Sequence, residues 1–315
     1  MSGIRPFFTG VKIDRMCEER CNPEAEKKFL GDPTALCILF NRFMVAIVTE
    51  TKELYMSNLH SEALGLIQRD TLTFLGVQLN EAKTPIFSAQ IQEAKIASLR
   101  EGVSFERSLR AAPFLTPDDG ALLGYAKSMM RQHVVATFCP ACGSKTEPQW
   151  IGTKRFCATC NQDIFTRTDP VCIIAVVHPT DPRRVLLVHK LGFPKLFHSC
   201  VAGFIEPGET AEEATCREVM EETGVAVDIG TVRFVATQPW PADIGSQLMI
   251  GFVGRATTEE ITVDPNEIDH ARWYTVDEVT KAIEGDKEVT ENVLTLPVAL
   301  GLAIKLLRTW IETLN

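Results

Sequence analysis

The chain has 315 residues, 45% hydrophobic and 23% charged, which allows two or three globular domains and excludes disordered and collagen-like chains. The longest apolar run, residues 171–177, is far shorter than the roughly 18 residues that a membrane-spanning helix needs. The net charge of −9 comes from residues 169–315, where 12 Lys and Arg face 23 Asp and Glu; this argues against broad nucleic-acid binding and suits a site that gathers divalent cations.

The N-terminal part, residues 1–132, is expected to form an α/β domain. The apolar run at residues 36–48 is rich in β-branched and aromatic side chains and predicts a strand. Residues 74–87 predict two short strands around a polar turn. Thr116 is a suitable N-cap for a helix that runs to about residue 133. No catalytic constellation is recognised in this part of the sequence.

Two Cys-x-x-Cys pairs mark a short segment, residues 133–168. Cys139 and Cys142 are followed, after fourteen residues, by Cys157 and Cys160. Each turn aims two thiolates at one point, so two turns complete a tetrahedron of soft ligands around Zn²⁺. Four thiolates leave no open coordination position, and the segment has few apolar residues, so we predict one structural zinc per chain in a zinc ribbon. Two unrelated thiol pairs are the alternative.

Residues 169–315 alternate between strand-like and helical segments, which predicts a second α/β domain. Its first strand is the buried run at 171–177, and a turn leads to a partner strand at 185–189. The apolar residues at 299–313 recur at helical spacing and predict a helix that docks on the sheet.

The most informative stretch is a loop and helix within this domain. Thr210 and Glu213 form a capping box, and Gly224 is a natural helix stop, so a helix is predicted over residues 211–223. In the loop before it, Glu209 can reach back to Arg217 and fix the loop to the helix.

Three glutamates share one face of this helix. Glu218, Glu221 and Glu222 lie at positions i, i+3 and i+4, so their charges repel unless cations lie among them. Carboxylate oxygens on a rigid helix suit Mg²⁺ or Mn²⁺, which keep other positions for water and substrate phosphates. A solvated acidic helix face is the simpler alternative.

This stretch resembles the Nudix box, Gly-x5-Glu-x7-Arg-Glu-U-x-Glu-Glu-x-Gly-U, where U is a bulky aliphatic residue. The pattern is matched in full from Gly203 to Val225. By this resemblance the C-terminal domain is a Nudix α/β/α sandwich. Its loop and helix would bind divalent metals that carry a nucleoside diphosphate linked to another group, and water would cleave the pyrophosphate.

A cysteine quartet directly before a Nudix domain resembles the NADH pyrophosphatase branch of that superfamily. The branch carries a Ser-Gln-Pro-Trp-Pro-Phe-Pro-x-Ser motif, and Thr237–Ser246 is its counterpart here. Gln-Pro-Trp-Pro is intact, but Ala242 and Asp243 replace Phe-Pro and the serine lies one position later, so the loop is expected to differ in shape. By the resemblance, substrate would contact Gln238, Pro239, Trp240, Pro241 and Ser246.

Further positions are carried over from the same resemblance. Phe165, in a Phe-Thr-Arg-Thr-Asp-Pro segment that opens the domain, and Phe204, inside the box, would stack on the two faces of the nicotinamide. Glu267 would supply another metal carboxylate and Ala202 a backbone carbonyl. Ala303 matches a substrate-lining position. The family is dimeric, so a homodimer is expected.

The sequence thus predicts a zinc-containing Nudix hydrolase that splits NADH, and more weakly NAD⁺, into reduced or oxidised nicotinamide mononucleotide and AMP. Two or more Mg²⁺ or Mn²⁺ ions would be catalytic, and the general base is left open between Glu221 and Glu222. The catalytic residues would be Glu209, Arg217, Glu221 and Glu222, and the Mg²⁺ or Mn²⁺ ligands Ala202, Glu218, Glu221, Glu222 and Glu267.

Three other functions are open at this point. The nearest is removal of NAD caps from RNA 5′ ends by the same chemistry, which needs an open path for the RNA. Two more distant alternatives are other nucleoside diphosphate substrates such as ADP-ribose, and a non-enzymatic zinc-ribbon protein that binds nucleic acid. With no secretory signal recognised behind Met1, and no Ser-Lys-Leu type address at residues 313–315, the cytoplasm is expected, and a peroxisome-like organelle is the open alternative.

Overall fold

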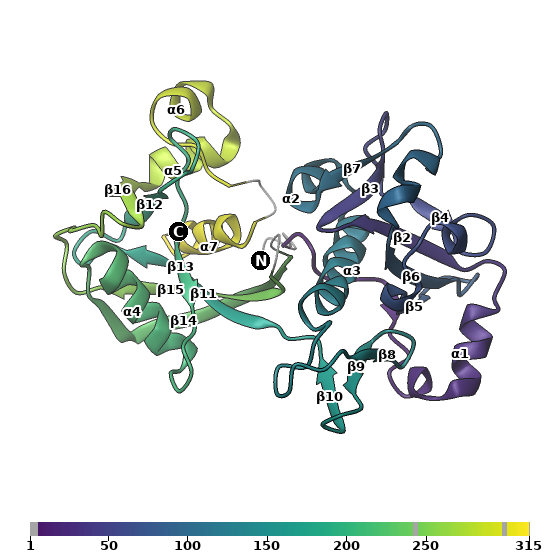
Figure 1. Cartoon of the computed structure of the whole chain (residues 1–315). Helices are drawn as coiled ribbons and strands as arrows, with labels where there is room; N and C mark the ends of the chain where they lie inside the picture. Colours follow the sequence, from purple (N-terminus) through teal and green to yellow (C-terminus); the bar gives the residue numbers. More distant parts are fainter. Residues whose placement is uncertain (1–5, 242–244, 298–300, 315) are drawn as a thin grey trace. The chain divides into compact units, whose positions relative to one another are not determined.

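The structure is a computed structural model that describes residues 6–241, 245–297 and 301–314, without the side chains of residues 109 and 110. The chain forms two compact units, shown in Figure 1. The N-terminal unit comprises Phe8–Thr168 and Pro239–Ser246, and the C-terminal unit comprises Met1–Phe7, Asp169–Gln238 and Gln247–Asn315. Within the described ranges, no helix is both long enough and apolar enough to cross a bilayer.

The N-terminal unit is built on a seven-stranded sheet in the order β1-β5-β6-β2-β3-β7, with β4 paired to β2. Strands β2 and β6 run parallel, and the other pairs are antiparallel. The strands are β1 (Ile13–Asp14), β2 (Leu36–Asn41), β3 (Met44–Val48), β4 (Met56–Asn58), β5 (Thr73–Gln78), β6 (Pro85–Gln90) and β7 (Val103–Arg107), and the helices are α1 (Pro23–Leu30), α2 (Ser108–Ala111) and α3 (Pro117–Val135).

The single strand predicted over residues 36–48 is wrong, because the chain turns back between β2 and β3. The turn is held by a residue far away in the sequence: Arg42 N donates to Gln90 Oε1 (2.8 Å), and Gln90 Nε2 donates to Arg42 O (2.9 Å). Arg42 adopts a left-handed φ of 55°. Because this residue is not a glycine, the sequence gives no sign of the turn. The strands predicted within 74–87 are confirmed as β5 and β6.

The helix predicted after Thr116 is confirmed as α3, and Thr116 Oγ1 accepts a hydrogen bond from Asp119 N (3.1 Å). The ribbon segment that follows forms an antiparallel sheet of β8 (Glu147–Gln149), β9 (Lys154–Cys157) and β10 (Gln162–Phe165). The ribbon falls within the N-terminal unit. The division into domains 1–132, 133–168 and 169–315 stays a prediction.

The C-terminal unit contains a six-stranded mixed sheet in the order β14-β15-β11-β12-β16, with β13 paired to β11. Strands β11 and β15 run parallel. The strands are β11 (Asp169–Val177), β12 (Arg184–Lys190), β13 (Val201–Phe204), β14 (Val227–Trp240), β15 (Gln247–Ala256) and β16 (Ile268–Thr275), and the helices are α4 (Ala211–Thr223), α5 (Val276–Glu284), α6 (Lys287–Asn292) and α7 (Leu302–Glu312).

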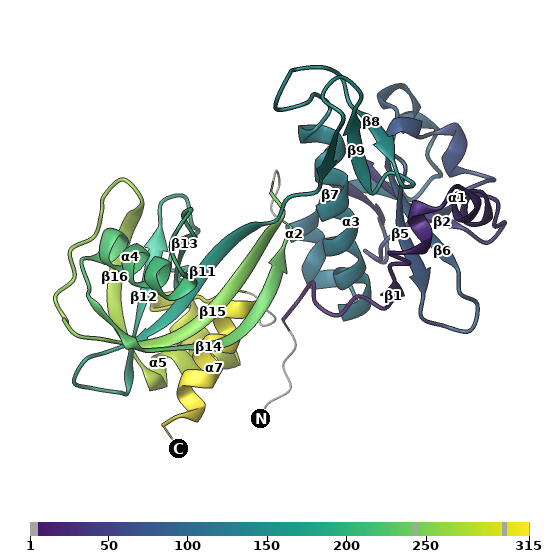
Figure 2. The same ribbon diagram turned by 90° about the horizontal axis from the view of Figure 1, so that it is seen from below.

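Helices cover both faces of this sheet. Along β11, Ile174 packs into the core beneath α4, whereas its neighbour Ile173 packs into the core shared with α5 and α7. Figure 2 shows α4 and α7 on opposite faces. Because successive strand residues point to opposite faces, the continuous apolar run at 171–177 supplies both cores. The predicted α/β/α sandwich is therefore confirmed.

The predicted strand at 185–189 is confirmed within β12, which pairs with β11. The C-terminal helix predicted over 299–313 is confirmed in its described part as α7, while residues 299 and 300 lie outside the described ranges.

Candidate active site

The loop and helix predicted at residues 203–225 have the expected local structure. Thr210 Oγ1 accepts from Glu213 N (3.2 Å), and Glu213 Oε2 accepts from Thr210 N (2.7 Å), so the capping box is complete. Gly224 ends the helix with a left-handed φ of 69°. Helix α4 therefore begins and ends at the predicted residues, and this fixes which side chains share its inner face.

Arg217 ties this helix to the loop in front of it. Its Nη2 and Nε atoms donate to the two carboxylate oxygens of Glu209 (2.5 and 3.1 Å), and Nη2 also donates to Phe204 O (2.8 Å). These hydrogen bonds hold the pKa of Glu209 below its ordinary value. Strand β13, the loop and α4 are thus joined through one guanidinium group.

The same arginine contacts two of the predicted metal ligands. Its Nη1 atom donates to Glu218 Oε1 (2.8 Å) and to Glu221 Oε2 (2.9 Å). Glu218 is largely buried, with 14% of its side chain exposed, whereas Glu221 is 61% exposed. The three carboxylates around Arg217 raise its pKa further above its usual range.

Gly203, the first residue of the motif, leaves room for one of these carboxylates. A Cβ atom at this position would lie only 1.9–2.3 Å from the carboxyl atoms of Glu218. Any larger residue would therefore push the Glu218 carboxylate away from β13. The glycine is needed here for space, because its φ is not in the left-handed region.

Glu222 is the most deeply buried acid of the group, with 2% of its side chain exposed. Its Oε1 accepts from Lys190 Nζ (2.5 Å), and its buried Oε2 has no hydrogen-bond partner in the described part of the chain. Burial raises the pKa of Glu222 to about 6, and the charges of Glu218 and Glu267 raise it too, while Lys190 acts in the opposite direction. Lys190 also donates to Ala202 O (2.9 Å).

These groups fit a divalent cation by their chemistry. Glu222 offers a buried oxygen, Oε2, that is unpaired among the described residues, its Oε1 shares Lys190 with the Ala202 carbonyl, and Glu218 lies against the neighbouring Gly203. Oxygen donors of this kind are the ligands that Mg²⁺ and Mn²⁺ prefer. Three of the predicted glutamate ligands, Glu218, Glu221 and Glu222, pair with Arg217 or Lys190. Glu267 is exposed in the turn before β16.

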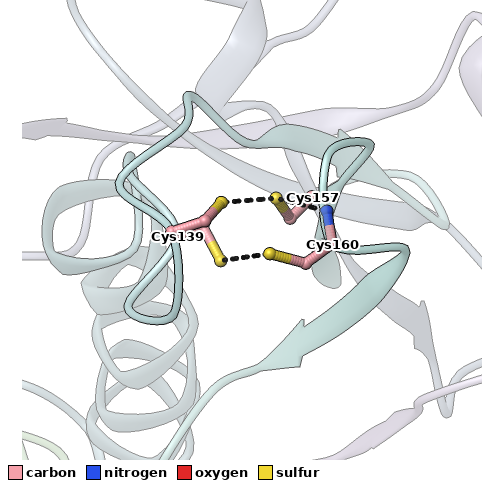
Figure 3. A group of neighbouring side chains, drawn as sticks. Cys139, Cys157 and Cys160 are labelled. Carbon is pink, nitrogen blue, oxygen red and sulfur yellow. Dashed lines mark hydrogen bonds between the residues drawn. The ribbon is translucent and has the colours of Figure 1, made fainter.

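The four predicted zinc ligands come together in the ribbon. Their sulfur atoms all lie within 4.8 Å of one another, with Cys139 Sγ 4.0 Å from Cys160 Sγ and Cys142 Sγ 3.6 Å from Cys157 Sγ. Figure 3 shows Cys139, Cys157 and Cys160 of this group. A tetrahedron with Zn–S bonds of about 2.3 Å has edges of about 3.8 Å. The cysteine cluster therefore has the size and the soft donors that Zn²⁺ requires.

The two predicted stacking rings are exposed and lie in different units. Phe165 ends β10 and is 54% exposed, with its ring centroid 5.9 Å from that of Trp150. Lys154 Nζ lies 3.9 Å from the centre of the Trp150 ring. Phe204 ends β13 and is 51% exposed. Both rings are open to a flat ligand, and their stacking on nicotinamide stays a prediction.

The predicted substrate loop divides between the units after Gln238. Gln238 is buried, donates to Phe7 O (3.0 Å) and accepts from Leu302 N (2.8 Å), so its amide group anchors the start of α7. Trp240 contacts the Phe8 ring edge-on, with centroids 6.1 Å apart.

Pro239 is half-buried, whereas Pro241, Ser246 and Ala303 are buried. Residues 242–244 lie outside the described ranges. Substrate contacts for this loop and for Ala303 stay predictions.

Sequence reasoning missed Lys190, which joins two of the predicted metal ligands. Lys190 follows Leu186 and Val188 at two-residue spacing along β12, and both of these residues pack beneath α4. Because every second strand residue points to the same face, this spacing could have placed Lys190 on the face that α4 covers. Its partner Glu222 is 32 residues away in the sequence, so no local motif pairs them.

Comparisons with known proteins bear on this site. The family described as "NUDIX domain" matches residues 169–293. The chain is 31% identical over 346 residues to "NAD-capped RNA hydrolase NUDT12" of Homo sapiens, an alignment that covers 97% of this chain and 73% of that protein. It is 34% identical over 221 residues to "NAD(P)H pyrophosphatase NUDT13, mitochondrial" of Mus musculus, covering 67% and 60%. With "NAD-capped RNA hydrolase NudC" of Mycobacterium bovis the identity is 33% over 192 residues, covering 60% and 59%.

A complete Nudix loop and helix on an α/β/α sandwich is the site of a metal-dependent hydrolase. The chain belongs to the Nudix hydrolases, in their NADH pyrophosphatase branch.

Proposed function

We propose that this protein hydrolyses the pyrophosphate bond of NADH, and of NAD⁺, to nicotinamide mononucleotide and AMP. The observation that carries the proposal is the buried Glu222 carboxylate of the Nudix helix, whose Oε2 has no partner among the described residues and whose Oε1 shares Lys190 with the Ala202 carbonyl. The likeness to proteins named for NAD(P)H pyrophosphatase and NAD-capped RNA hydrolase activity supports NAD as the common substrate element.

The bond to be opened is inert because its anionic oxygens repel a nucleophile. Divalent ions supply charge neutralisation and a bound water of lowered pKa. In this chain Glu218, Glu222 and the Ala202 carbonyl would hold such ions, with Glu221 and Glu267 at the more exposed edge. The Glu209–Arg217 ion pair holds the loop against the helix, so the carboxylates are oriented before substrate arrives.

The proton acceptor for the attacking water stays open between Glu221 and Glu222. Glu222 has an oxygen, Oε2, that is unpaired among the described residues, and such an oxygen can accept a proton. Its burial beside Ala202 equally suits a metal ligand. The exposed Phe204 ring, in the same unit as these acids, offers a flat surface on which a nicotinamide ring can stack.

The identity of the metals is part of the proposal. We assign Zn²⁺ to the cysteine cluster, where its role is structural, and two or more Mg²⁺ or Mn²⁺ ions to the acidic site. A homodimer and a cytoplasmic location stay predictions.

Removal of NAD caps from RNA is the second candidate function. It uses the same bond and the same residues, and it is favoured by the relative from Homo sapiens, which aligns over 97% of this chain and is named an NAD-capped RNA hydrolase. The acidic character of residues 169–315 weighs against a long RNA contact in the C-terminal unit.

Steady-state kinetics on four substrates would test the proposal. NADH, NAD⁺, ADP-ribose and an NAD-capped oligoribonucleotide would be compared at equal concentrations with Mg²⁺ and with Mn²⁺. We expect kcat/KM to be highest for NADH and the products to be AMP and reduced nicotinamide mononucleotide. A higher kcat/KM on the capped RNA would favour the second function, and absence of hydrolysis of all four would refute both.

A further inference from the structure

Lys190 occupies a corner of the acidic site that the proposed function assigns to a divalent ion. Its ammonium group donates to Glu222 Oε1 (2.5 Å) and to Ala202 O (2.9 Å) at the same time. Lys190 is 29% exposed, whereas Glu222 is 2% exposed, so the lysine reaches from the surface into the buried end of the site.

The position of Lys190 is built into the strand. Pairing of β12 with β16 is regular up to His189 and shifts register between His189 and Lys190. Lys190 pairs with Ile268, so the extra residue of the shift is Asp269 of β16, and the alternation of side chains along β12 is unbroken. On the preceding residues of the same face, Leu186 and Val188 pack beneath α4. The lysine is therefore directed at the helix that carries Glu222.

We propose that Lys190 is an internal counter-cation of the metal site, which holds Glu222 and the Ala202 carbonyl until a divalent ion displaces it. The inference rests on the proposed function, because it requires that these two groups bind the ion. Lys190 bonds Glu222 Oε1 and Ala202 O, so an ion that takes these two oxygens competes with the two lysine hydrogen bonds. Lys190 would thus be a positioning residue that sets the affinity of the site for metal.

The surrounding charges explain why a cation is needed there. Arg217 is engaged by Glu209, Glu218 and Glu221, and Glu222 is paired with Lys190 instead. A buried carboxylate that loses its only ion-pair partner is strongly destabilising. Lys190 therefore stabilises the fold in the absence of metal, and the same interaction opposes metal binding. Its removal should change these two properties in opposite directions.

The test compares Lys190→Met with the matched control Lys195→Met. Lys195 is an exposed lysine five residues later in the same unit. Two readouts are measured for each variant: the Kd for Mn²⁺ by calorimetry, and the melting temperature in EDTA. For Lys190→Met we expect Mn²⁺ to bind about 10-fold tighter or more, since a charge-assisted hydrogen bond no longer competes. We also expect the melting temperature in EDTA to fall by about 3 °C or more. Lys195→Met should match the wild type in both.

Two results separate failure of this inference from failure of the proposed function. If Mn²⁺ binding is lost in Glu222→Gln but is unchanged or weaker in Lys190→Met, the counter-cation role is wrong and the metal site stands. If the wild type shows no Glu222-dependent Mn²⁺ binding, the metal site is wrong, and the inference is wrong with it.

A measurement on the wild type covers the case in which Lys190→Met does not fold. The rate of reductive methylation of Lys190 is followed by mass spectrometry with and without Mg²⁺. A displaced ammonium group is more accessible, so we expect faster labelling of Lys190 with Mg²⁺ and no change at Lys195. An unchanged or slower rate at Lys190 would overturn the proposal.

Discussion

At the scale of single residues, the acidic site balances buried carboxylates against two cations. Arg217 pairs with the acids at the loop and the exposed edge, and Lys190 pairs with the most buried one. Glu222 Oε2 has no hydrogen-bond partner among the described residues, and burial raises the pKa of this carboxyl group. An unpaired oxygen at that depth is the feature of this site that calls for a metal ion.

Glu222→Gln is expected to lower kcat on NADH by about 10³-fold or more, because the buried ligand oxygen loses its charge. The fold and the zinc content should remain, since the amide has nearly the same shape and needs no desolvation of charge. Glu212→Gln, on the exposed face of the same helix, is the matched control and should stay near wild type. Hydrolysis of NADH at a near-normal rate by Glu222→Gln would contradict the assignment of this residue.

Gly203→Ala tests the space that the glycine leaves. The added Cβ would overlap the Glu218 carboxyl group, so we expect Glu218 to move and kcat to fall by about 10²-fold or more. The control is Gly65→Ala, where an added Cβ meets nothing within 4 Å. Melting temperature and kinetics would be measured for both. Wild-type activity in Gly203→Ala would show that the position of Glu218 is not important.

At the scale of elements, the local sequence was sufficient to predict the bounds of α4, but it was not sufficient to predict the turn between β2 and β3. Thr210, Glu213 and Gly224 act within one turn of the helix ends, so the sequence alone predicts both boundaries. The turn at Arg42 depends on Gln90, and the contact of Lys190 depends on Glu222 of α4. Contacts between distant residues leave no periodic pattern, which is why these features could not be predicted.

The ribbon is expected to depend on its metal. Cys157→Ser should release zinc and lower the melting temperature by about 5 °C or more, because the small sheet has little apolar core of its own. Zinc content would be measured by inductively coupled plasma mass spectrometry. Cys17→Ser changes an exposed cysteine outside the cluster and should keep the zinc. A Cys157→Ser protein that melts at the wild-type temperature would rule out a structural role for the ion.

A buried histidine joins α3 to the ribbon and should make this junction sensitive to acid. Arg155, itself 1% exposed, donates to His133 Nδ1 (2.9 Å), and His133 Nε2 lies 2.7 Å from Thr73 Oγ1. Burial and the Arg155 charge lower the pKa of His133 to about 4. The unfolded chain takes up the proton near pH 6.5 and the folded chain only near pH 4, so stability falls as pH drops through this window.

The lowered pKa of His133 changes the free energy of unfolding by about 3 kcal/mol across this whole pH window. The melting temperature would be measured from pH 7 to pH 4 for the wild type and for His133→Gln. The wild type should lose more stability over this range than the variant, which has no imidazole to titrate. Parallel curves for the two proteins would show that His133 is not responsible.

At the scale of the whole molecule, the sequence separates two kinds of metal chemistry. The thiolate cluster lies in the N-terminal unit, and the acidic site lies in the C-terminal unit, whose residues carry the excess of Asp and Glu. Fold class and motif positions could be predicted because each depends on a short pattern. The partners of Gln238, in contrast, are the Phe7 carbonyl and the Leu302 amide, which are far away in the sequence, so the place of this glutamine in the C-terminal unit depends on tertiary packing.

Anomalous diffraction from crystals soaked with Mn²⁺ and a slowly hydrolysed NADH analogue would test the central claim most directly. We predict anomalous peaks beside Glu218, Glu222 and the Ala202 carbonyl, in contact with the pyrophosphate of the analogue. A bound dinucleotide with no anomalous peak at these residues would contradict the account.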